Sequence, residues 1–146
     1  MKSSISKTAA LDIINLRHKI LRPGRPEATA HFDGDELPTT YHFATKQVPN
    51  ESEPICCVSY MLSELNGEPA YQLRGMATDD NFRGMGLGKD IVAFAEAMIS
   101  ADTTIKNYWC NARKESVGFY EKLGWKIVSK EFDVPDVGPH FKMVKN

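Results

Sequence analysis

The sequence predicts one domain of mixed α/β class, with strands and helices interspersed along residues 1–146. Two strand-like segments, 55–64 and 69–77, flank Asn66-Gly67, a dipeptide preferred in tight β-hairpin turns. Apolar residues recur at helical spacing in 87–99. A glycine-rich stretch, FRGMGLGKDI (82–91), joins the hairpin to this helix. The segment order therefore connects a central strand to a helix through a glycine-rich turn.

The first part of the chain is expected to hold a helix, a long loop and a strand. The apolar pattern over 8–21 predicts an amphipathic helix that ends at a Pro-Gly pair. Residues 22–38 are rich in Pro, Gly and Asp and predict a loop of a length that is often functional in small domains. A strand is expected over 39–45 and a second loop over 49–54.

The last part of the chain is expected to add three strands and a short helix. A strand is predicted over 105–111, and a short helix within ESVGFYEKLGW (115–125) closes at Gly124. Two final strands are predicted over 126–132 and 140–145.

The composition is that of a soluble globular protein, with 42% hydrophobic and 25% charged residues. A net charge of -1 and the lack of a basic stripe argue against a nucleic-acid partner. The longest apolar run, 55–62, is too short to cross a membrane, and residues 1–7 hold no hydrophobic signal sequence. We therefore expect a cytoplasmic protein with neither nucleic-acid nor membrane partners.

The three cysteines form no recognisable metal or redox motif. Cys56 and Cys57 are adjacent, and Cys110 stands alone, so neither a CxxC nor a Cys/His metal pattern exists. All three lie in apolar, strand-like segments, which predicts buried, reduced thiols and no metal site.

The glycines at 84, 86 and 88 suggest an anion site, because glycine-rich turns before helices present free backbone N–H groups. A nucleotide P-loop would need glycine where Arg83 stands and a hydroxyl where Asp90 stands. A dinucleotide loop would need its third glycine at Lys89. A plain strand-to-helix turn remains the alternative, although it hardly needs three glycines.

The pattern Arg-x-x-Gly-x-Gly, formed by Arg83, Gly86 and Gly88, resembles the pyrophosphate loop of the GNAT superfamily of N-acetyltransferases. A second match, ARKESVGFYEKLGW, resembles the late helix of that family. The resemblance covers 55–146 well and the first 50 residues in outline. It implies a mostly antiparallel central sheet of about six or seven strands, flanked by helices, with a V-shaped splay that holds coenzyme A.

The resemblance implies acetyl-CoA as the cofactor. The main-chain amides of the glycine loop would hold its pyrophosphate, with Arg83 and Lys89 adding positive charge. Met76 and Ala77 would offer backbone hydrogen bonds to the pantetheine arm. The loop residues implied as cofactor contacts are Arg83, Gly84, Met85, Gly86, Leu87, Gly88 and Lys89.

The chain departs from the family pattern before the late helix. Where the family often has Asn and Ala, seven and four residues before its tyrosine, this chain has Arg113 and Ser116. Asn111 lies two positions upstream of Arg113. Asn111 and Arg113 are therefore candidate cofactor contacts, with a solvated surface arginine as the alternative at 113.

The resemblance implies that Tyr120 is the general acid. The leaving thiol has a pKa of about 8.5 and tyrosine one of about 10, so a tyrosine stays protonated at neutral pH and can donate to the developing thiolate. Judged by spacing alone, Tyr120 is an aromatic residue packing a short helix. The family match favours the acid role.

The sequence names neither the general base nor the acceptor. Asp79 and Asp80 are better explained as turn residues, and the histidines at 31, 42 and 140 compete with a water relay for the base role. The acceptor is an amine of a small molecule or protein, selected by the loops 22–37 and 135–140. A homodimer is possible.

Two other functions compete with N-acetyltransfer. An acyl-CoA-binding sensor or interaction module would keep the loop without efficient turnover. A nucleotide-binding ATPase is opposed by Arg83 and Asp90.

Overall fold

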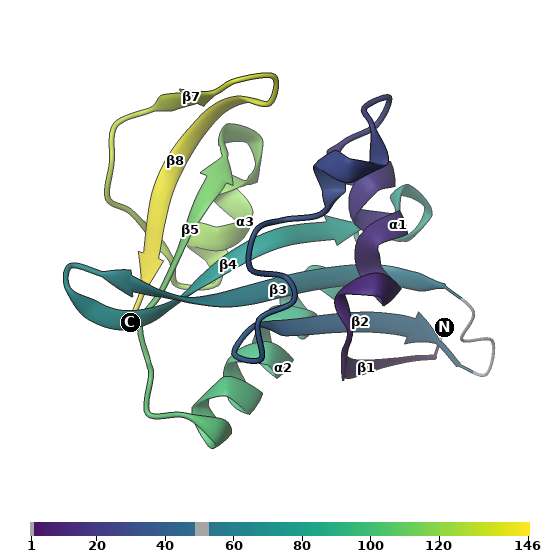
Figure 1. Ribbon diagram of the computed structural model, residues 1–146, viewed down its shortest axis with the longest axis horizontal. Helices are drawn as coiled ribbons and strands as arrows, with labels where there is room; N and C mark the ends of the chain where they lie inside the picture. The colour runs from purple at the N-terminus through teal and green to yellow at the C-terminus, as the bar shows by residue number, and fades with distance from the viewer. Residues whose placement is uncertain (1, 49–52) are drawn as a thin grey trace. The chain divides into compact units, whose positions relative to one another are not determined.

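The computed structural model describes residues 2–48 and 53–146, and its elements appear in Figure 1. Strands and helices follow one another in the order β1 (Ser3–Thr8), α1 (Ala10–Leu21), η1 (Glu27–Ala30), β2 (Tyr41–Gln47), β3 (Pro54–Leu65), β4 (Glu68–Thr78), η2 (Asp80–Phe82), α2 (Leu87–Asp102), β5 (Tyr108–Arg113), η3 (Lys114–Ser116), α3 (Val117–Lys122), β6 (Lys126–Ile127), β7 (Phe132–Val134) and β8 (Gly138–Lys145). The elements labelled η are single 3-10 turns.

The strands form one hydrogen-bonded sheet of eight strands in the order β1-β2-β3-β4-β5-β8-β6, and β7 also pairs with β8. The β4–β5 pair is parallel, whereas the pairs on both sides of it are antiparallel. The predicted mixed α/β class with a mostly antiparallel, helix-flanked sheet is confirmed. Among the described residues the strand count exceeds the expected six or seven.

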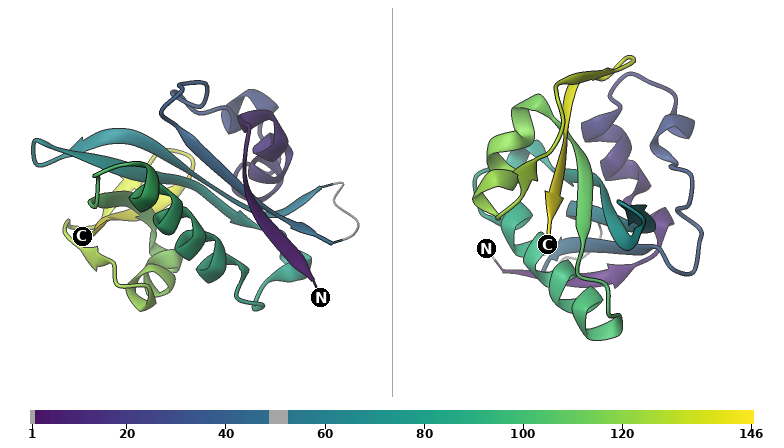
Figure 2. Two further views of the ribbon diagram at one scale, coloured as in Figure 1. Left: turned by 90° about the horizontal axis from the view of Figure 1, so that it is seen from below. Right: turned by 90° about the vertical axis from the view of Figure 1, so that its left-hand side faces the viewer.

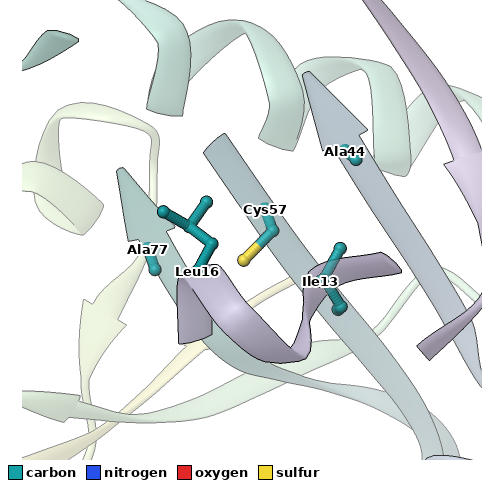
Figure 3. Close-up of a cluster of buried hydrophobic side chains, with 5 residues drawn as sticks. All are labelled: Ile13, Leu16, Ala44, Cys57 and Ala77. Atoms are coloured by element: carbon teal, nitrogen blue, oxygen red, sulfur yellow. The ribbon is translucent and has the colours of Figure 1, made fainter. Parts of the chain in front are cut away.

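The chain divides into two compact units, and the first comprises Met1–Met61 and Arg74–Thr104. Helices α1 and α2 cover opposite faces of its strands (Figure 2). On the α1 face, Ile13 and Leu16 pack against Ala44, Cys57 and Ala77 from three neighbouring strands (Figure 3). These small strand residues leave room for the helix to lie close to the sheet.

The α2 face of the same unit is aromatic. Phe43 directly precedes Ala44 in β2, so its side chain points to the other side of the sheet. Its ring meets the ring of Phe94, on α2, edge-on at a centroid distance of 5.9 Å. Strand alternation in β2 thus serves both helices at once.

The second unit comprises Leu62–Leu73 and Ile105–Asn146. Residues 140–145 of strand β8 pair with the whole of β5, and β8 also pairs with β6 and β7. Trp125 is 2% exposed and contacts the rings of Tyr108 and Tyr120. This aromatic cluster fixes α3 against the strand it follows.

Most predicted elements are confirmed, including the helix over 8–21 and the Asn66-Gly67 hairpin. Both turn residues have positive φ, 53° at Asn66 and 81° at Gly67, as a two-residue hairpin turn of this kind requires. The strand predicted over 105–111 begins only at Tyr108. Residues 49–52 of the loop predicted over 49–54 lie outside the described residues.

Two expectations about strands were wrong. Strand β1 was not predicted, because SSISKT is polar and mostly exposed and is held through its backbone ladder with β2. The single strand predicted over 126–132 is divided into β6 and β7. Between them the side chain of Ser129 accepts a hydrogen bond from the backbone N–H of Lys142, 2.8 Å away, so a hydroxyl replaces the backbone ladder there.

The cysteines are free and buried, as predicted. Burial raises the pKa of Cys56 to about 11 and those of Cys57 and Cys110 to about 12. Such thiols stay protonated at neutral pH and are poor nucleophiles.

Candidate active site

The segment between β4 and the glycine loop is held by Asp79. Its backbone N–H donates to the carbonyl of Ile55 at 2.8 Å, and its side chain accepts from the N–H of Asn81 at 2.9 Å. Lys19 of α1 donates to the same carboxylate at 2.9 Å, and this hydrogen bond lowers the pKa of Asp79. Asp79 is therefore a turn and capping residue, as its position after a strand predicted.

At two positions the glycine loop adopts a backbone conformation that favours glycine. Gly84 has φ of 75° and Gly86, the residue before α2, has φ of 79°. A Cβ at either position would meet no protein atom within 4 Å, so this side of the loop is open. Leu87, which is 6% exposed, anchors the start of α2, whereas Met85 is 49% exposed.

The start of α2 offers hydrogen-bond donors to an anion. The first N–H groups of any α-helix have no carbonyl partner within the helix, and here they belong to residues that begin at Leu87. Gly88 and Lys89 lie in this first turn, with Lys89 exposed. The exposed side chain of Arg83 pairs with Asp80 at 2.9 Å between Nε and Oδ1. The free helix donors thus lie in the same short, open segment as two exposed cations, Arg83 and Lys89.

Strand β4 brings Met76 and Ala77 to the loop. The register between β4 and β5 consists of Tyr71 with Tyr108 and Gln72 with Trp109, and β4 then continues to Thr78. Ala77 places its side chain in the core below α1, next to Leu16 (Figure 3). Its side chain is thus used for packing, whereas its backbone belongs to the strand that leads into the loop.

Tyr120 is 5% exposed on α3, in the second unit. Its ring contacts Phe119 at a centroid distance of 5.0 Å and Trp125 at 5.5 Å. Burial, and to a lesser degree Cys110, raise the pKa of Tyr120 well above its usual range. The hydroxyl is therefore fully protonated at neutral pH.

The family model for the acetyltransferase (GNAT) domain matches residues 51–146. The uncharacterized N-acetyltransferase YitI of Bacillus subtilis (strain 168) is 33% identical over 137 residues, which are 92% of this chain and 89% of that protein. The chain belongs to the GNAT acetyltransferase family. As a member of this family it is an acyltransferase.

Solved structures share the GNAT fold. An acyl-CoA N-acyltransferase from Pseudomonas aeruginosa has a TM-score of 0.80 at 13% identity, covering 99% of this chain and all (100%) of that chain. An aminoglycoside 6'-N-acetyltransferase, crystallised with coenzyme A, has a TM-score of 0.74 at 15% identity, covering 97% of this chain and 96% of that chain. At these identities the likeness establishes the architecture.

Asn111 and Arg113, the candidate cofactor contacts before the late helix, lie on β5. Asn111 is exposed opposite Lys142 of β8, and Arg113 is half-buried opposite His140. Their assignment as cofactor contacts stays a prediction.

The histidines of this GNAT chain are largely engaged in structure. His42 is buried, with Nδ1 2.7 Å from Ser59 Oγ and Nε2 2.8 Å from the carbonyl of Asp35. His140 is buried, and its Nδ1 lies 2.7 Å from the carbonyl of Gly138. His31 is exposed beside Glu27. None of these contacts identifies a general base.

A buried arginine on α1 was missed by the sequence analysis. Arg17 is fully buried and donates from Nη1 to Asp35 Oδ2 at 2.6 Å and to the carbonyl of Ala30 at 2.9 Å, and from Nη2 to Ser59 Oγ at 2.9 Å. The ring of Phe32 stacks on its guanidinium, 4.0 Å from ring centroid to Cζ. An arginine within the apolar stripe of a helix was the available signal.

The Arg17 group holds the loop over 22–40 in place. Ser59 accepts from Arg17 and also contacts His42, which in turn reaches the Asp35 carbonyl, so the contacts form a closed ring. A Cβ at Gly75, where φ is 62°, would lie 2.8 Å from Arg17 Nε. The loop thus requires glycine on β4 at this point.

Two further observations concern metals and membranes. Within residues 2–48 and 53–146, no group of three or more His, Cys, Asp or Glu side chains is placed to hold a metal ion. Every helix in the same ranges is too short or too polar to cross a bilayer.

Proposed function

We propose that this protein transfers an acetyl group from acetyl-CoA to an amine acceptor. The observation that carries the proposal is the pair of positive-φ glycines, Gly84 and Gly86, which open onto the N-terminus of α2. This is the arrangement by which a backbone binds a diphosphate without side chains in the way. The coenzyme A seen with the aminoglycoside acetyltransferase gives independent support.

The residues from Gly84 to Lys89 bind the pyrophosphate through main-chain N–H groups. Arg83 adds charge after leaving Asp80, and this exchange costs little because exposed ion pairs contribute only about 0–1 kcal/mol. Met76 and Ala77 hydrogen-bond the pantetheine arm along β4, beyond the end of its ladder with β5. Asn111 and Arg113 complete the proposed contacts.

When bound, acetyl-CoA supplies a thioester carbonyl that an amine nitrogen attacks, with the electrons of the broken C–S bond going to sulfur. Tyr120 donates its hydroxyl proton to that sulfur, and this hydroxyl is protonated at neutral pH, although the burial that raises its pKa also makes it a weaker acid. The assignment of Tyr120 rests on the match of its helix to the family pattern. The proton released by the amine passes to water.

The test is thiol release from acetyl-CoA in the presence of polyamines, aminoglycosides, amino acids and peptides, with mass spectrometry of the acetylated product. Calorimetry with coenzyme A measures binding separately. Amine-dependent thiol release with an acetylated product supports the proposal. Binding without acetyl transfer to any amine would favour the sensor module, and no binding at millimolar coenzyme A would overturn the proposal.

A further inference from the structure

We propose that the guanidinium of Arg74 binds a carboxylate on the acceptor, so that the preferred acceptors are amines that also carry a carboxylate. This inference rests on the proposed function and adds the chemical class of its acceptor. Arg74 belongs to β4 and lies two residues before Met76.

Arg74 is a half-buried cation without a carboxylate partner. Its Nη1 donates to the backbone carbonyl of Asp33 at 2.7 Å and lies 3.3 Å from the sulfur of Met61. Among the described residues no carboxylate oxygen lies within 4.0 Å of this guanidinium. A partly desolvated guanidinium of this kind gains strongly from an anion.

The hydrogen bonds of Arg74 leave one edge of the guanidinium available. Both contacts described above are made by Nη1, and within the described residues Nε and Nη2 make none. Nε and Nη2 donate in parallel, which is the geometry that a carboxylate accepts through both of its oxygens. The available edge therefore matches a carboxylate in shape as well as in charge.

Phe32 fixes the position of this guanidinium. Its ring centroid lies 5.0 Å from Cζ of Arg74, 4.0 Å from Cζ of Arg17 and 5.4 Å from Cζ of Arg22, so one ring contacts three cations. Arg17 forms a direct ion pair with Asp35, whereas Arg74 interacts with the carboxylates of Asp35 and Asp33 only beyond ion-pair distance. The stacking lowers the mobility of Arg74 and presents it in a defined orientation.

The location matches the proposed reaction. Two residues along a strand span about 7 Å, so a carboxylate on Arg74 lies near the part of β4 assigned to the pantetheine arm. The carboxylate and the amine of a small amino acid, together with one hydrogen bond to the protein, span a similar distance. An amino carboxylate held by Arg74 thus places its nitrogen near the proposed thioester.

The test compares acceptors in matched pairs, each amino acid or short peptide against its own C-terminal amide. The ratio of kcat/KM for acid over amide is measured for the native protein, Arg74→Gln, Arg74→Lys and the control Lys126→Gln, which alters an exposed cation outside the loops expected to select the acceptor. Converting the carboxylate to an amide also changes the basicity of the amine. The acid-over-amide ratio of each variant is therefore compared with the ratio of the native protein. Circular dichroism checks that each variant is folded.

We expect Arg74→Gln to lower the acid-over-amide ratio by on the order of 10-fold, mainly through KM of the acid, with Arg74→Lys intermediate and Lys126→Gln unchanged. A lowered ratio seen with free amino acids, with peptides or with both identifies which of these acceptors supplies the carboxylate. An unchanged ratio in Arg74→Gln overturns the inference while leaving acetyl transfer intact.

Binding is measured as well, so that the inference can be tested without turnover. N-acetylated amino acids and their amides are titrated into the full chain and followed by NMR. Tighter binding of the acids that is lost in Arg74→Gln supports a carboxylate site even if no amine is acetylated. Equal binding of acids and amides in the native protein overturns it.

Discussion

Arg17 and Asp35 form a two-point ion pair across 18 residues of sequence, with Nη1–Oδ2 at 2.6 Å and Nη2–Oδ1 at 3.3 Å. Arg17 is fully buried, and the side chain of Asp35 is 9% exposed. The pair ties the loop over 22–40 to α1, and through Ser59 and His42 to two strands. The loop that we expect to select the acceptor is thus built as a fixed part of the first unit.

Replacing Arg17 by methionine is expected to lower the free energy of unfolding by about 3 kcal/mol, because Asp35 is left as a nearly buried, unpaired charge. Urea denaturation measures the change. Lys19→Met is the control, since its pair with Asp79 is exposed on the lysine side and should matter by less than about 1 kcal/mol. Equal effects of the two variants would contradict the structural role of Arg17.

The contribution of Asp35 to stability is expected to depend on pH. The hydrogen bond from Arg17 holds the pKa of Asp35 below its usual range despite burial, which acts in the other direction. The folded state therefore favours the charged form of Asp35. The free energy of unfolding that the native protein gains over Asp35→Asn is complete above about pH 4 and declines as the pH falls through the lowered pKa. Urea midpoints of both proteins between pH 2 and 7 measure this. A difference that stays constant with pH would exclude the ion pair as its source.

Replacing Gly84 by alanine is expected to weaken coenzyme A binding by at least about 10-fold, since a methyl group would project into the open side of the loop. Gly24→Ala is a matched control. Gly24 also has φ of 75° and open space around its Cβ, so the backbone strain is the same. Calorimetry with coenzyme A and thermal unfolding of both variants separate binding from stability. Similar binding losses in both would refute a role for the loop.

Replacing Asp80 by asparagine is expected to strengthen coenzyme A binding by a few-fold, because Arg83 no longer has to leave its 2.9 Å ion pair. The gain should shrink at high salt, which screens exposed charges. Titrations at two ionic strengths test this. Weaker binding in Asp80→Asn would place Arg83 outside the pyrophosphate site.

Replacing Tyr120 by phenylalanine is expected to lower kcat by about 10²-fold or more while the affinity for acetyl-CoA stays nearly constant. Phenylalanine keeps the contacts with Phe119 and Trp125 and removes the proton donor. Single-turnover rates avoid any limit from product release. Phe119→Leu, which alters the same aromatic cluster, serves as the packing control. A native rate in Tyr120→Phe would leave Tyr120 as a packing residue.

Local signals explain what the sequence analysis predicted well. The hairpin turn has positive φ at two adjacent residues, Asn66 and Gly67, and the glycine loop has positive φ at Gly84 and Gly86. Each turn is therefore specified by residues that lie close together in the sequence. The start of α2 follows from the same loop. Seven of the eleven contacts proposed for the cofactor, residues 83–89, lie in this local segment.

Long-range contacts explain what was missed. Arg17 bonds to Asp35 and Ser59, which lie 18 and 42 positions away in the sequence, and no local pattern reveals such contacts. Arg17 also interrupts an apolar stripe without changing its helical period. Strand β1 has few apolar residues and depends on the backbone of β2. The break between β6 and β7 depends on Ser129 meeting Lys142, a tertiary contact.

Ala77 takes part in two features of the molecule. Its side chain packs in the hydrophobic layer under α1, and its backbone lies on the strand edge proposed to bind the thioester carrier. A side chain larger than alanine there would push against Leu16 and displace the strand without touching any ligand. If Ala77 contacts the cofactor as proposed, we expect substitutions on the buried side of α1 to change cofactor affinity from a distance. Evolution or engineering could use that layer to adjust the enzyme while every contact residue stays the same.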